Sequence, residues 1–589
     1  MIEDYAMIGD GETAALVGND GSIDWMCWPR FDSDACFAAL LGNAENGRWL
    51  IAPAGLTAKA KVSRRYQDDT LIVETDFETA TGAVRIIDFM PMREQHPSLV
   101  RMVVGLRGTV AMRMDFAARF NYGDLSPWVQ PCDGGFVGDV GPDQIVLRGP
   151  VTMSHDQRRI QSDFVVATGQ RVPFVLRYGS SDAGLPPPID AEMVLRETQD
   201  YWRDWIGRFD KPTHWPEAVK RSLITLKALI YKPTGGLIAA ATTSLPEKPG
   251  GKLNWDYRFS WIRDATFTLD ALLNAGFKDE AVAWRDWMLR AVAGEPDKMR
   301  IMYRVDGARH IPEFEVEWLD GYHHAKPVRI GNAASTQHQA DVYGELIDAV
   351  HLASRAGISR TPRIVAVETQ IVEHIEKTWQ KPGAGLWESR GEPRHYVYSR
   401  AMAWVGVDRF LRAGETRDYA GAERVARWEV LRDTIHAEVC QSGFHPGLGR
   451  FVEYYGGQTI DACLLLLPLV GFLPIDDPRI TATIEAVERE LTEDGFVRRK
   501  KPQGEVSEGS FIACTLWLAD CQNMQGRTTE ARQTLERVLA IRNDLGLLSE
   551  EYDVPGRHLA GNFPQALSHL ALVTTALGLS GPVLQRGGG

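Results

Sequence analysis

The sequence predicts a multidomain β + α fold, in which a sandwich of antiparallel sheets precedes an (α/α)6 barrel. The chain has 589 residues, which is more than one hydrophobic core usually organises. Short β-branched runs separated by turns fill its first third, and a helical period replaces them from residue 217 almost to the end. The predicted parts are a sandwich domain at 1–185, a helical linker at 186–216, a helical barrel at 217–580 and a disordered tail at 581–589.

The strand pattern begins with a tight-turn signal at Asn19-Asp20-Gly21 between two apolar segments. A hairpin is predicted where residues 71–79 and 83–89 flank a turn. The other predicted strands are 99–106, 110–120, 164–167 and 172–178. The run from Gly184 to Pro188 ends this pattern, and a helical connector is predicted at 191–208.

About twelve helices are predicted beyond the connector. They are 217–231, 262–276, 278–293, 337–355, 361–379, 397–413, 421–439, 459–470, 477–491, 508–524, 528–540 and 563–578. Parts of 459–470 and 508–524 are apolar nearly all round, as in helices buried on both sides, whereas 421–439 and 528–540 carry many charges. Six inner helices alternating with six outer ones predict a closed toroid. An open solenoid is the alternative, but the chain shows no repeat of fixed period.

Composition excludes several classes of partner. The formal net charge of −13 argues against nucleic acid and against an anionic membrane surface. Residues 1–5 lack the basic and apolar features of a signal peptide, and the longest apolar run, 462–474, is too short to span a bilayer. The seven cysteines form no CxxC pair, as expected of free thiols in a reducing compartment. We therefore expect a cytoplasmic protein whose oligomeric state is open, with a homo-oligomer allowed.

The segment from Asn254 to Asp264 leads into a predicted inner helix and combines four aromatic residues with two Arg and two Asp. Arg263 and Asp264 stand at the start of that helix, with Trp261 just before them. An Arg–Asp pair there can hold sugar hydroxyls through charge-assisted hydrogen bonds. A carboxylate placed against the helix dipole explains Asp264 equally well.

Two further polar loops precede predicted inner helices. In 385–395, Glu388 follows Trp387, and an indole raises a carboxyl pKa by desolvation, as a general acid requires; a surface loop of Glu–Arg pairs is the alternative. In 548–553, three carboxylates crowd beside Tyr552, and crowding of this kind perturbs pKa values; a solvated turn is the alternative. HExxH, Walker A and GxSxG motifs are absent, so neither a metal nor a cofactor is expected.

Together and in this order, these clusters resemble glycoside hydrolase family 15, the family of glucoamylase, glucodextranase and bacterial trehalase. Residues 260–264 (SWIRD) are similar to its W-x-R-D segment, 386–388 (LWE) to its L-W-E segment, and 549–553 (SEEYD) to its S-E-Q-Y-D segment. Residues 20–25 and 329–334 resemble the trehalase-like bacterial branch. The resemblance covers nearly the whole chain.

The resemblance implies a β-supersandwich followed by an (α/α)6 catalytic barrel, and hydrolysis with inversion at the anomeric carbon. It implies Glu388 as general acid and Glu550 as general base. Glu551 stands where the family has Gln and is the alternative base, with Glu550 favoured by position. The remaining residues expected to bind substrate are Trp261, Arg263, Asp264, Arg329, Trp387, Glu392 and Tyr552.

The expected partner is a small α-glucoside, with trehalose or short α-gluco-oligosaccharides favoured because no starch-binding module is evident. Longer α-1,4 or α-1,6 glucans are the next alternative. A disaccharide phosphorylase would need a phosphate site where Glu550 stands, and an idle carbohydrate-binding protein would be expected to lack one of the two carboxylates.

Overall fold

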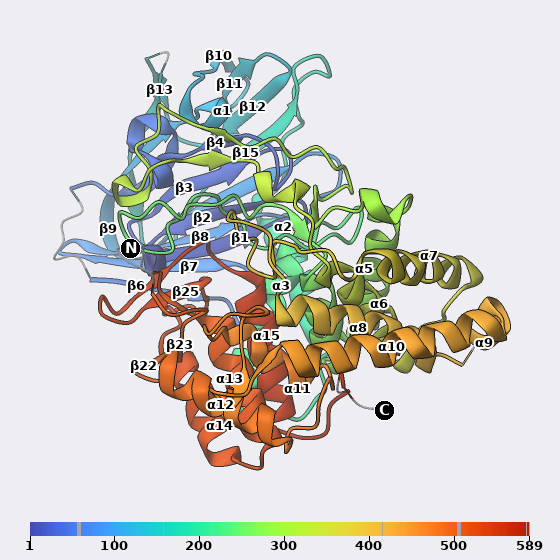
Figure 1. Ribbon diagram of the computed structural model, residues 1–589. Coiled ribbons are helices and arrows are strands. Elements are labelled where there is room, and N and C mark those ends of the chain that lie inside the picture. Colours follow the sequence, from blue (N-terminus) through green and yellow to red (C-terminus); the bar gives the residue numbers. More distant parts are fainter. Residues whose placement is uncertain (56–60, 157, 415, 503–507, 585, 588–589) are drawn as a thin grey trace.

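The computed structural model describes residues 1–55, 61–156, 158–414, 416–502, 508–584 and 586–587. A sheet-rich N-terminal part lies at one end of the molecule and a helical C-terminal part at the other, with α2 (Ala191–Ile206) and α3 (Pro216–Leu229) between them (Figure 1). Among the described residues, no helix is both long and apolar enough to cross a membrane.

Among the described residues, the N-terminal part is a connected sheet of fifteen strands whose pairings are all antiparallel. The strands are β1 (Tyr5–Gly9), β2 (Ala14–Gly18), β3 (Ser22–Cys27), β4 (Ala35–Phe37), β5 (Arg48–Pro53), β6 (Lys61–Tyr66), β7 (Val73–Thr79), β8 (Gly82–Phe89), β9 (Ser98–Ala117), β10 (Trp128–Cys132), β11 (Gly135–Val140), β12 (Asp143–Arg148), β13 (Ser154–His155), β14 (Ile160–Ala167) and β15 (Arg171–Ser180). The predicted hairpin of 71–79 and 83–89 is β7 paired with β8, and the predicted turn at 19–21 joins β2 to β3.

The long strand β9 corrects one prediction. We expected separate strands at 99–106 and 110–120, but a single strand runs from Ser98 to Ala117. Its first half pairs with β8 and β15, and its second half with β5 and β14. The apparent break is Gly108, whose φ is +66°, and a Cβ there would lie 2.2 Å from the carbonyl oxygen of Thr81. Gly108 is therefore required by a close approach between strands, although a glycine at this point of the sequence looks like part of a turn.

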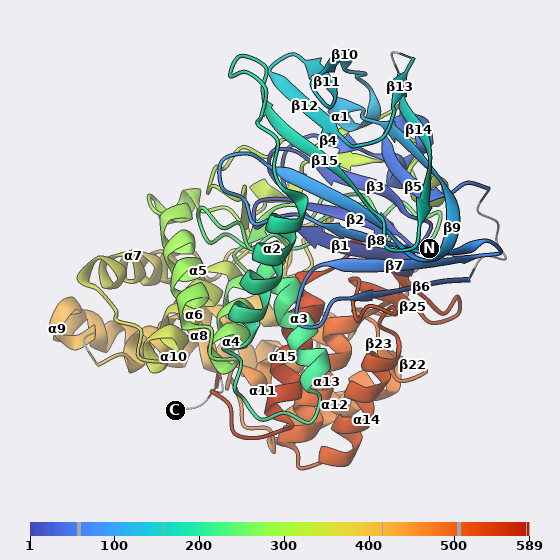
Figure 2. The ribbon, with the colours of Figure 1, turned by 180° about the vertical axis from the view of Figure 1, so that it is seen from behind.

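The helical part follows the predicted order of elements. Its helices after α3 are α4 (Asp264–Asn274), α5 (Lys278–Ala291), α6 (Asp341–Arg355), α7 (Pro362–Thr378), α8 (Val397–Arg412), α9 (Thr416–Ala420), α10 (Ala422–Ser442), α11 (Leu466–Leu469), α12 (Pro478–Glu490), α13 (Ile512–Met524), α14 (Thr528–Ala540) and α15 (Ala566–Gly578). In sequence order, α4, α6, α8, α11, α13 and α15 each contact the next, and α15 contacts α4. The contacts thus close into a ring, which an open solenoid would not do. Figure 2 shows these helices packed together below the sheets.

Two of the predicted inner helices are shorter than expected. The segment predicted as 459–470 is a 3₁₀ turn, Ala462–Leu465, followed by α11, because Asp461 caps the turn and Pro468 prevents a longer helix. The segment predicted to begin at 508 is helical only from Ile512, and Ser510–Phe511 forms strand β24. This strand pairs with β25 (Glu551–Asp553), which places Phe511 opposite Glu551.

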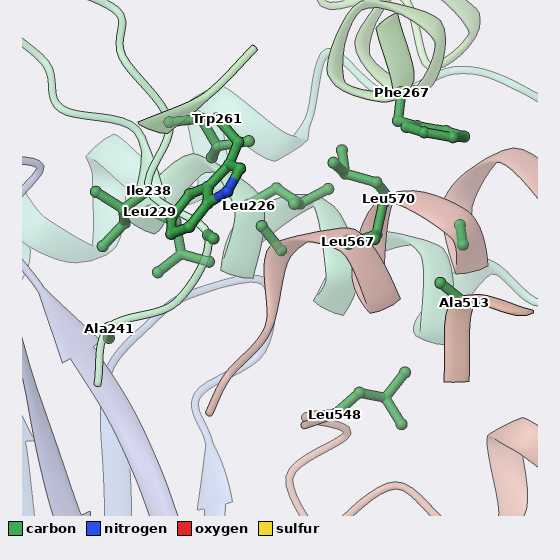
Figure 3. Packing of buried hydrophobic residues seen from close by; sticks show 14 of the residues in the cluster. Leu226, Leu229, Ile238, Ala241, Trp261, Phe267, Ala513, Leu548, Leu567 and Leu570 are labelled. Carbon is green, nitrogen blue, oxygen red and sulfur yellow. The ribbon is translucent and has the colours of Figure 1, made fainter. Parts of the chain in front are cut away.

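Both parts of the molecule contribute to one buried core. The indole N–H of Trp25, in β3, donates a 2.8 Å hydrogen bond to the carbonyl of Ala241, in the loop that follows α3. Trp261 is 2% exposed and lies in the same core as Leu229 and Ile238 (Figure 3). The loops before the helices are therefore packed against the sheets.

The C-terminal tail corrects another prediction. We expected 581–589 to be disordered, and of these residues 585, 588 and 589 lie outside the described part of the chain. Arg586, however, is buried and pairs at 3.0 Å with both Glu345 and Asp348 of α6. Its backbone carbonyl also accepts a hydrogen bond from Arg409. Two buried carboxylates thus require a cation from the tail, an interaction that apolar periodicity cannot reveal.

We predict that Arg586→Ala lowers the free energy of unfolding by about 3 kcal/mol, because it leaves the buried Glu345 carboxylate without the guanidinium that pairs with it. Asp348 keeps Arg409 at 2.9 Å, which limits the loss. Chemical denaturation would measure the effect. Arg113→Ala, which breaks an exposed pair with Asp163, is the control and should change stability little. Equal effects of the two substitutions would contradict the structural role of Arg586.

Candidate active site

A cavity of 340 Å³ lies where the loops preceding the inner helices meet. Four segments expected from the sequence to be polar or functional supply part of its walls: the long loop after α3, the 329–334 stretch, the loop around Glu388 and the segment that ends at Glu550, before β25. Residues 499, 500, 508 and 511 form a fifth part of the wall. The lining residues are Glu247, Leu253, Trp255, Tyr257, Arg263, Asn332, Ala334, Trp387, Glu388, Ser389, Arg390, Arg499, Lys500, Glu508, Phe511 and Glu550. The cavity is therefore rich in carboxylates, guanidinium groups and aromatic rings.

Glu388 has a backbone conformation that L-residues rarely adopt, with φ of +58°. The side-chain amide of Gln337 donates 3.2 Å hydrogen bonds to the carbonyls of Glu388 and Ser389, which holds this turn. The carboxylate accepts hydrogen bonds from the indole of Trp261 at 2.6 Å and from Arg263 at 3.2 Å. Backbone strain kept in place by surrounding contacts is typical of functional positions.

Glu550 lies deeper, with 2% of its surface exposed, and accepts a 2.7 Å hydrogen bond from the hydroxyl of Tyr257. Its neighbour Glu551 does not line the cavity. The Glu551 carboxylate instead accepts a hydrogen bond from the backbone N–H of Gly509 and lies 3.3 Å from Arg499. Of the two consecutive glutamates, only Glu550 therefore faces the space that a ligand would fill.

The two cavity carboxylates are linked through neighbouring aromatic rings. Tyr257, which binds Glu550, packs edge-on against Trp261, which binds Glu388, with ring centroids 5.4 Å apart. Both rings come from the segment that leads into α4. This one segment thus sets the positions of both carboxylates.

Arg499 supplies positive charge to a second group of carboxylates. Its guanidinium lies 2.7 Å from Glu247 and 3.3 Å from Glu551, and it also pairs with Glu508. The carboxylate oxygens of these three residues lie within 4.8 Å of one another, a spacing that would suit a metal ion. A guanidinium occupies the cationic position in this group, and it also stacks over the ring of Trp387 at 5.3 Å.

Burial dominates the electrostatics of the cavity. Desolvation raises the pKa of Glu388, against the opposing effect of Arg263 and of the Trp261 hydrogen bond. It raises the pKa of Glu550 to about 7, although Arg499 and the Tyr257 hydroxyl both stabilise the ionised form. The pKa of Glu247 rises to about 8 for the same reason. Burial raises the pKa of both Glu388 and Glu550, so their pKa values alone do not show which carboxyl is the acid and which is the base.

Five of the other residues predicted to bind substrate lie on or next to the cavity. Arg263 lines the cavity and pairs at 3.0 Å with Asp264, which is not itself a lining residue. Trp387 lines it and donates its indole N–H to Asp461. Trp261 does not line the cavity but donates its indole N–H to the Glu388 carboxylate. Arg329 is held by the backbone carbonyls at 252 and 254 and stacks over the ring of Trp255 at 4.6 Å, so it supports the wall from outside.

Two predicted residues lie away from the cavity. Glu392 is exposed and lines a neighbouring cavity, because the loop turns outward after the strained residue Glu388. Tyr552 packs against Phe496 at 4.9 Å and faces a third cavity. The Tyr552 side chain therefore lies outside the residues that line the cavity.

Sequence reasoning missed Glu247 and Arg499 and did not single out Tyr257. Glu247 belongs to the long loop at 232–260, and the length of that loop was the only signal available for it. Arg499 belongs to a run of basic residues that looks like a solvated surface segment. Their meeting in space depends on closure of the helical ring, which brings loops more than 200 residues apart together.

Comparison with known proteins agrees with this geometry. The family model for glycosyl hydrolases family 15 matches residues 215–577, and the model for the trehalase-like N-terminal domain matches residues 1–202. A trehalase of Thermoplasma volcanium is 34% identical over 99% of this chain and 94% of its own length. A trehalase of Mycobacterium tuberculosis is 35% identical over 98% of this chain and 89% of its own.

A solved structure of a bacterial glucoamylase complexed with acarbose has the same overall fold. The TM-score is 0.76 at 13% sequence identity, and the match covers 99% of this chain and 94% of that one. The chain belongs to glycosyl hydrolases family 15. It is therefore a glycoside hydrolase, with a sheet-rich N-terminal part and a helical C-terminal part.

We predict that Tyr257→Phe raises the pKa of Glu550, because the lost hydroxyl stabilises the ionised carboxylate. A hydrogen bond worth roughly 1.4 kcal/mol corresponds to about one pKa unit. If Glu550 must be ionised to act, the acidic limb of the kcat/KM profile should move to higher pH by about that amount. A profile unchanged on the acidic side would contradict the contact or the role of Glu550.

Proposed function

We propose that the protein is an inverting, exo-acting α-glucosidase that hydrolyses trehalose. The observation that carries this proposal is the pair of carboxylates, Glu388 and Glu550, lining one small cavity beside the Arg263–Asp264 pair. Two carboxyl groups on either side of a glycosidic bond are the arrangement that glycoside hydrolysis requires. The trehalases of Thermoplasma volcanium and Mycobacterium tuberculosis, matched over nearly the full chain, support the choice of substrate.

In the proposed mechanism, Glu388 protonates the leaving glycosidic oxygen while Glu550 removes a proton from a water molecule on the opposite face of the sugar. Attack of that water on the anomeric carbon releases β-glucose from the non-reducing end. Arg263, oriented by Asp264, is placed to hold hydroxyls of the same glucose unit. Trp255 and Trp387 offer flat apolar faces on which a sugar ring can pack.

The size of the cavity supports a small substrate. Its 340 Å³ lies near the lower limit of about 300 Å³ for small-molecule sites. A second cavity of 620 Å³, however, shares Ser389, Lys500 and Glu508 with the first. This neighbouring space favours short maltose-series or isomaltose-series oligosaccharides, or the ends of longer α-1,4 or α-1,6 glucans, as the second candidate substrates.

A phosphorylase is less well supported. Its phosphate would need a cationic cradle at the position of the base, whereas Glu550 and Glu247 place carboxylates there. Arg499, the cation nearest to them, already pairs with three glutamates. We therefore propose water as the nucleophile, and a reaction without a cofactor, a metal, nucleic acid or a membrane as partner.

We also propose that the ring of inner helices is an (α/α)6 barrel and that the sheets form a supersandwich. The proposed domains are 1–185 for the sheets, 186–216 for the linker and 217–580 for the catalytic barrel. The closed ring of helix contacts and the division of β9 between two sets of strands support this assignment. All seven cysteines are free thiols, which supports a reducing, cytoplasmic location.

A substrate panel tests the proposed function directly. Purified enzyme would be incubated with trehalose, maltose, isomaltose and maltoheptaose, and glucose release would be measured with and without added phosphate. We expect the highest kcat/KM on trehalose, without any need for phosphate as co-substrate. Preference for maltoheptaose would instead select the glucoamylase-type alternative, and formation of glucose 1-phosphate would overturn the hydrolase mechanism.

Substitution of the carboxylates separates their roles. Glu388→Gln should lower kcat on trehalose at least ~100-fold, yet retain much of its activity on glucosyl fluoride, whose leaving group needs little protonation. Glu550→Gln should lose activity on both substrates.

The matched control is Glu551→Gln, which changes the adjacent carboxyl outside the cavity. Its loss should be far smaller than that of Glu550→Gln, and a loss of the same size would move the base to Glu551. Equal losses of Glu388→Gln on both substrates would remove Glu388 from the acid role.

A further inference from the structure

Arg258 follows Tyr257 and joins the active-site segment to the N-terminal sheets. It is 1% exposed, and it pairs with Asp256 through hydrogen bonds of 2.9 and 2.7 Å. Its Nη1 donates to the backbone carbonyl of Ser33 at 2.7 Å, and its Nη2, which also binds Asp256, donates to the hydroxyl of Tyr122 at 2.9 Å. This guanidinium thus joins the segment before α4 to the N-terminal part of the chain.

Asp256 extends the connection to the far wall of the cavity. Its carboxylate accepts a 3.0 Å hydrogen bond from the backbone N–H of Gly331. The next residue, Asn332, lines the cavity, and its side-chain amide donates to the backbone carbonyl of Asp256. The Asp256–Arg258 pair therefore fixes three segments relative to one another: the N-terminal sheets, the segment before α4 and the 329–334 stretch.

Tyr122 is held in an unusual conformation. Its φ is +56°, and the φ of the preceding Asn121 is +49°, both in the left-handed region that non-glycine residues rarely adopt. The Tyr122 ring is 1% exposed and lies beneath the Arg258 guanidinium, whose carbon is 5.3 Å from the ring centroid. The surroundings must stabilise this conformation, and strained residues of this kind tend to gather at functional sites.

A fully buried ion pair contributes little net stability, because desolvation of both charges offsets their attraction. The Asp256–Arg258 pair instead restricts the position of the residue that lies between its two members. Tyr257 lies between the two paired residues, so a guanidinium anchored on both sides limits how far the Tyr257 hydroxyl can move from Glu550. A displacement of about 1 Å at a catalytic group is enough to lower the rate by as much as ~100-fold.

We propose that Arg258 and Tyr122 are positioning residues, through which the N-terminal sheets hold Tyr257 against Glu550. The N-terminal sheets then contribute to catalysis as well as to the stability of the fold. This inference rests on the proposed role of Glu550 as general base. It assigns to the N-terminal part a measurable effect on catalysis that a purely structural domain would lack.

The test uses the ionisation of Glu550 as its readout. The titratable or charged groups that act on this carboxyl are Tyr257, Arg263, Arg499, Glu247, Glu508 and Glu551. In the described part of the chain, neither Arg258 nor Tyr122 forms a hydrogen bond or ion pair with Glu550. A change in the acidic limb of the pH profile on substitution of Tyr122 must therefore be transmitted through the segment that carries Tyr257.

Tyr122→Phe removes one hydroxyl and keeps the ring, so it should fold. We expect the acidic limb of kcat/KM to move to higher pH by about half a unit, in the same direction as with Tyr257→Phe, because a weakened Tyr257 hydrogen bond raises the pKa of Glu550. We expect kcat to fall several-fold with KM nearly unchanged. In the double variant Tyr122→Phe/Tyr257→Phe, the acidic limb should lie at the same pH as in Tyr257→Phe alone. Both substitutions act through the hydrogen bond between Tyr257 and Glu550, so their effects should not add.

Tyr66→Phe is the matched control. Tyr66 is a buried tyrosine of β6 whose hydroxyl binds the backbone of Met7, and it should leave the pH profile unchanged. An acidic limb that moves equally in Tyr66→Phe, or that does not move in Tyr122→Phe, would overturn the proposal. Additive shifts in the double variant would overturn it as well.

A second comparison uses buried arginines. Arg258→Lys should move the limb, whereas Arg101→Lys should not, although Arg101 forms a similarly buried pair with Asp88 at 2.7 Å within the sheets. Both variants are expected to lower the melting temperature, so stability alone does not distinguish them.

The profiles are measured on whichever glucoside the wild-type enzyme hydrolyses best. Failure of the proposed function would appear as an inactive wild type, and failure of this inference as an active enzyme with an unmoved limb.

Discussion

Two hydrogen bonds from adjoining rings hold the two cavity carboxylates, and the geometry of the candidate active site follows from their arrangement. Tyr257 donates to Glu550 and Trp261 to Glu388, and the rings pack together at 5.4 Å. A hydrolase with two carboxyl groups needs them at a fixed separation, with room for a sugar and a water molecule between them. The closed ring of helices provides the frame, and the segment before α4 sets both carboxylates within it.

Buried charge is compensated by a single arginine at two places in the helical part. Arg499 pairs with three glutamates beside the cavity, and Arg586 pairs with two carboxylates of α6. In each case a cation that is remote in sequence satisfies carboxylates that would otherwise be costly to bury. At the cavity this compensation is incomplete, so the pKa values of Glu388 and Glu550 remain raised. Glu550, whose pKa rises to about 7, is thereby suited to proton transfer near neutral pH.

Much of this architecture could be predicted from the sequence. Helical periodicity located the helices because each buries one face, and the order of three motifs indicated Glu388 and Glu550, which the structure brings to one cavity. Pairing between distant segments could not be predicted: β9 crosses an apparent turn at Gly108, and Phe511 enters a strand opposite Glu551. Nor could periodicity find Glu247 or Arg499, which become neighbours only when the ring closes. The packing of Tyr552 against Phe496, outside the lining of the cavity, is likewise a contact that the motif does not reveal.

The stereochemistry of the first product distinguishes the proposed inverting mechanism from a retaining one. Trehalose would be hydrolysed in an NMR tube, and the anomeric protons followed before mutarotation is appreciable. Attack by a water molecule on the face opposite to the bond inverts one glucose and leaves the other unchanged, so we expect α- and β-glucose in equal amounts at the earliest times. Release of α-glucose alone would mean retention, and would contradict the assignment of Glu388 and Glu550 as an acid and base pair acting on water.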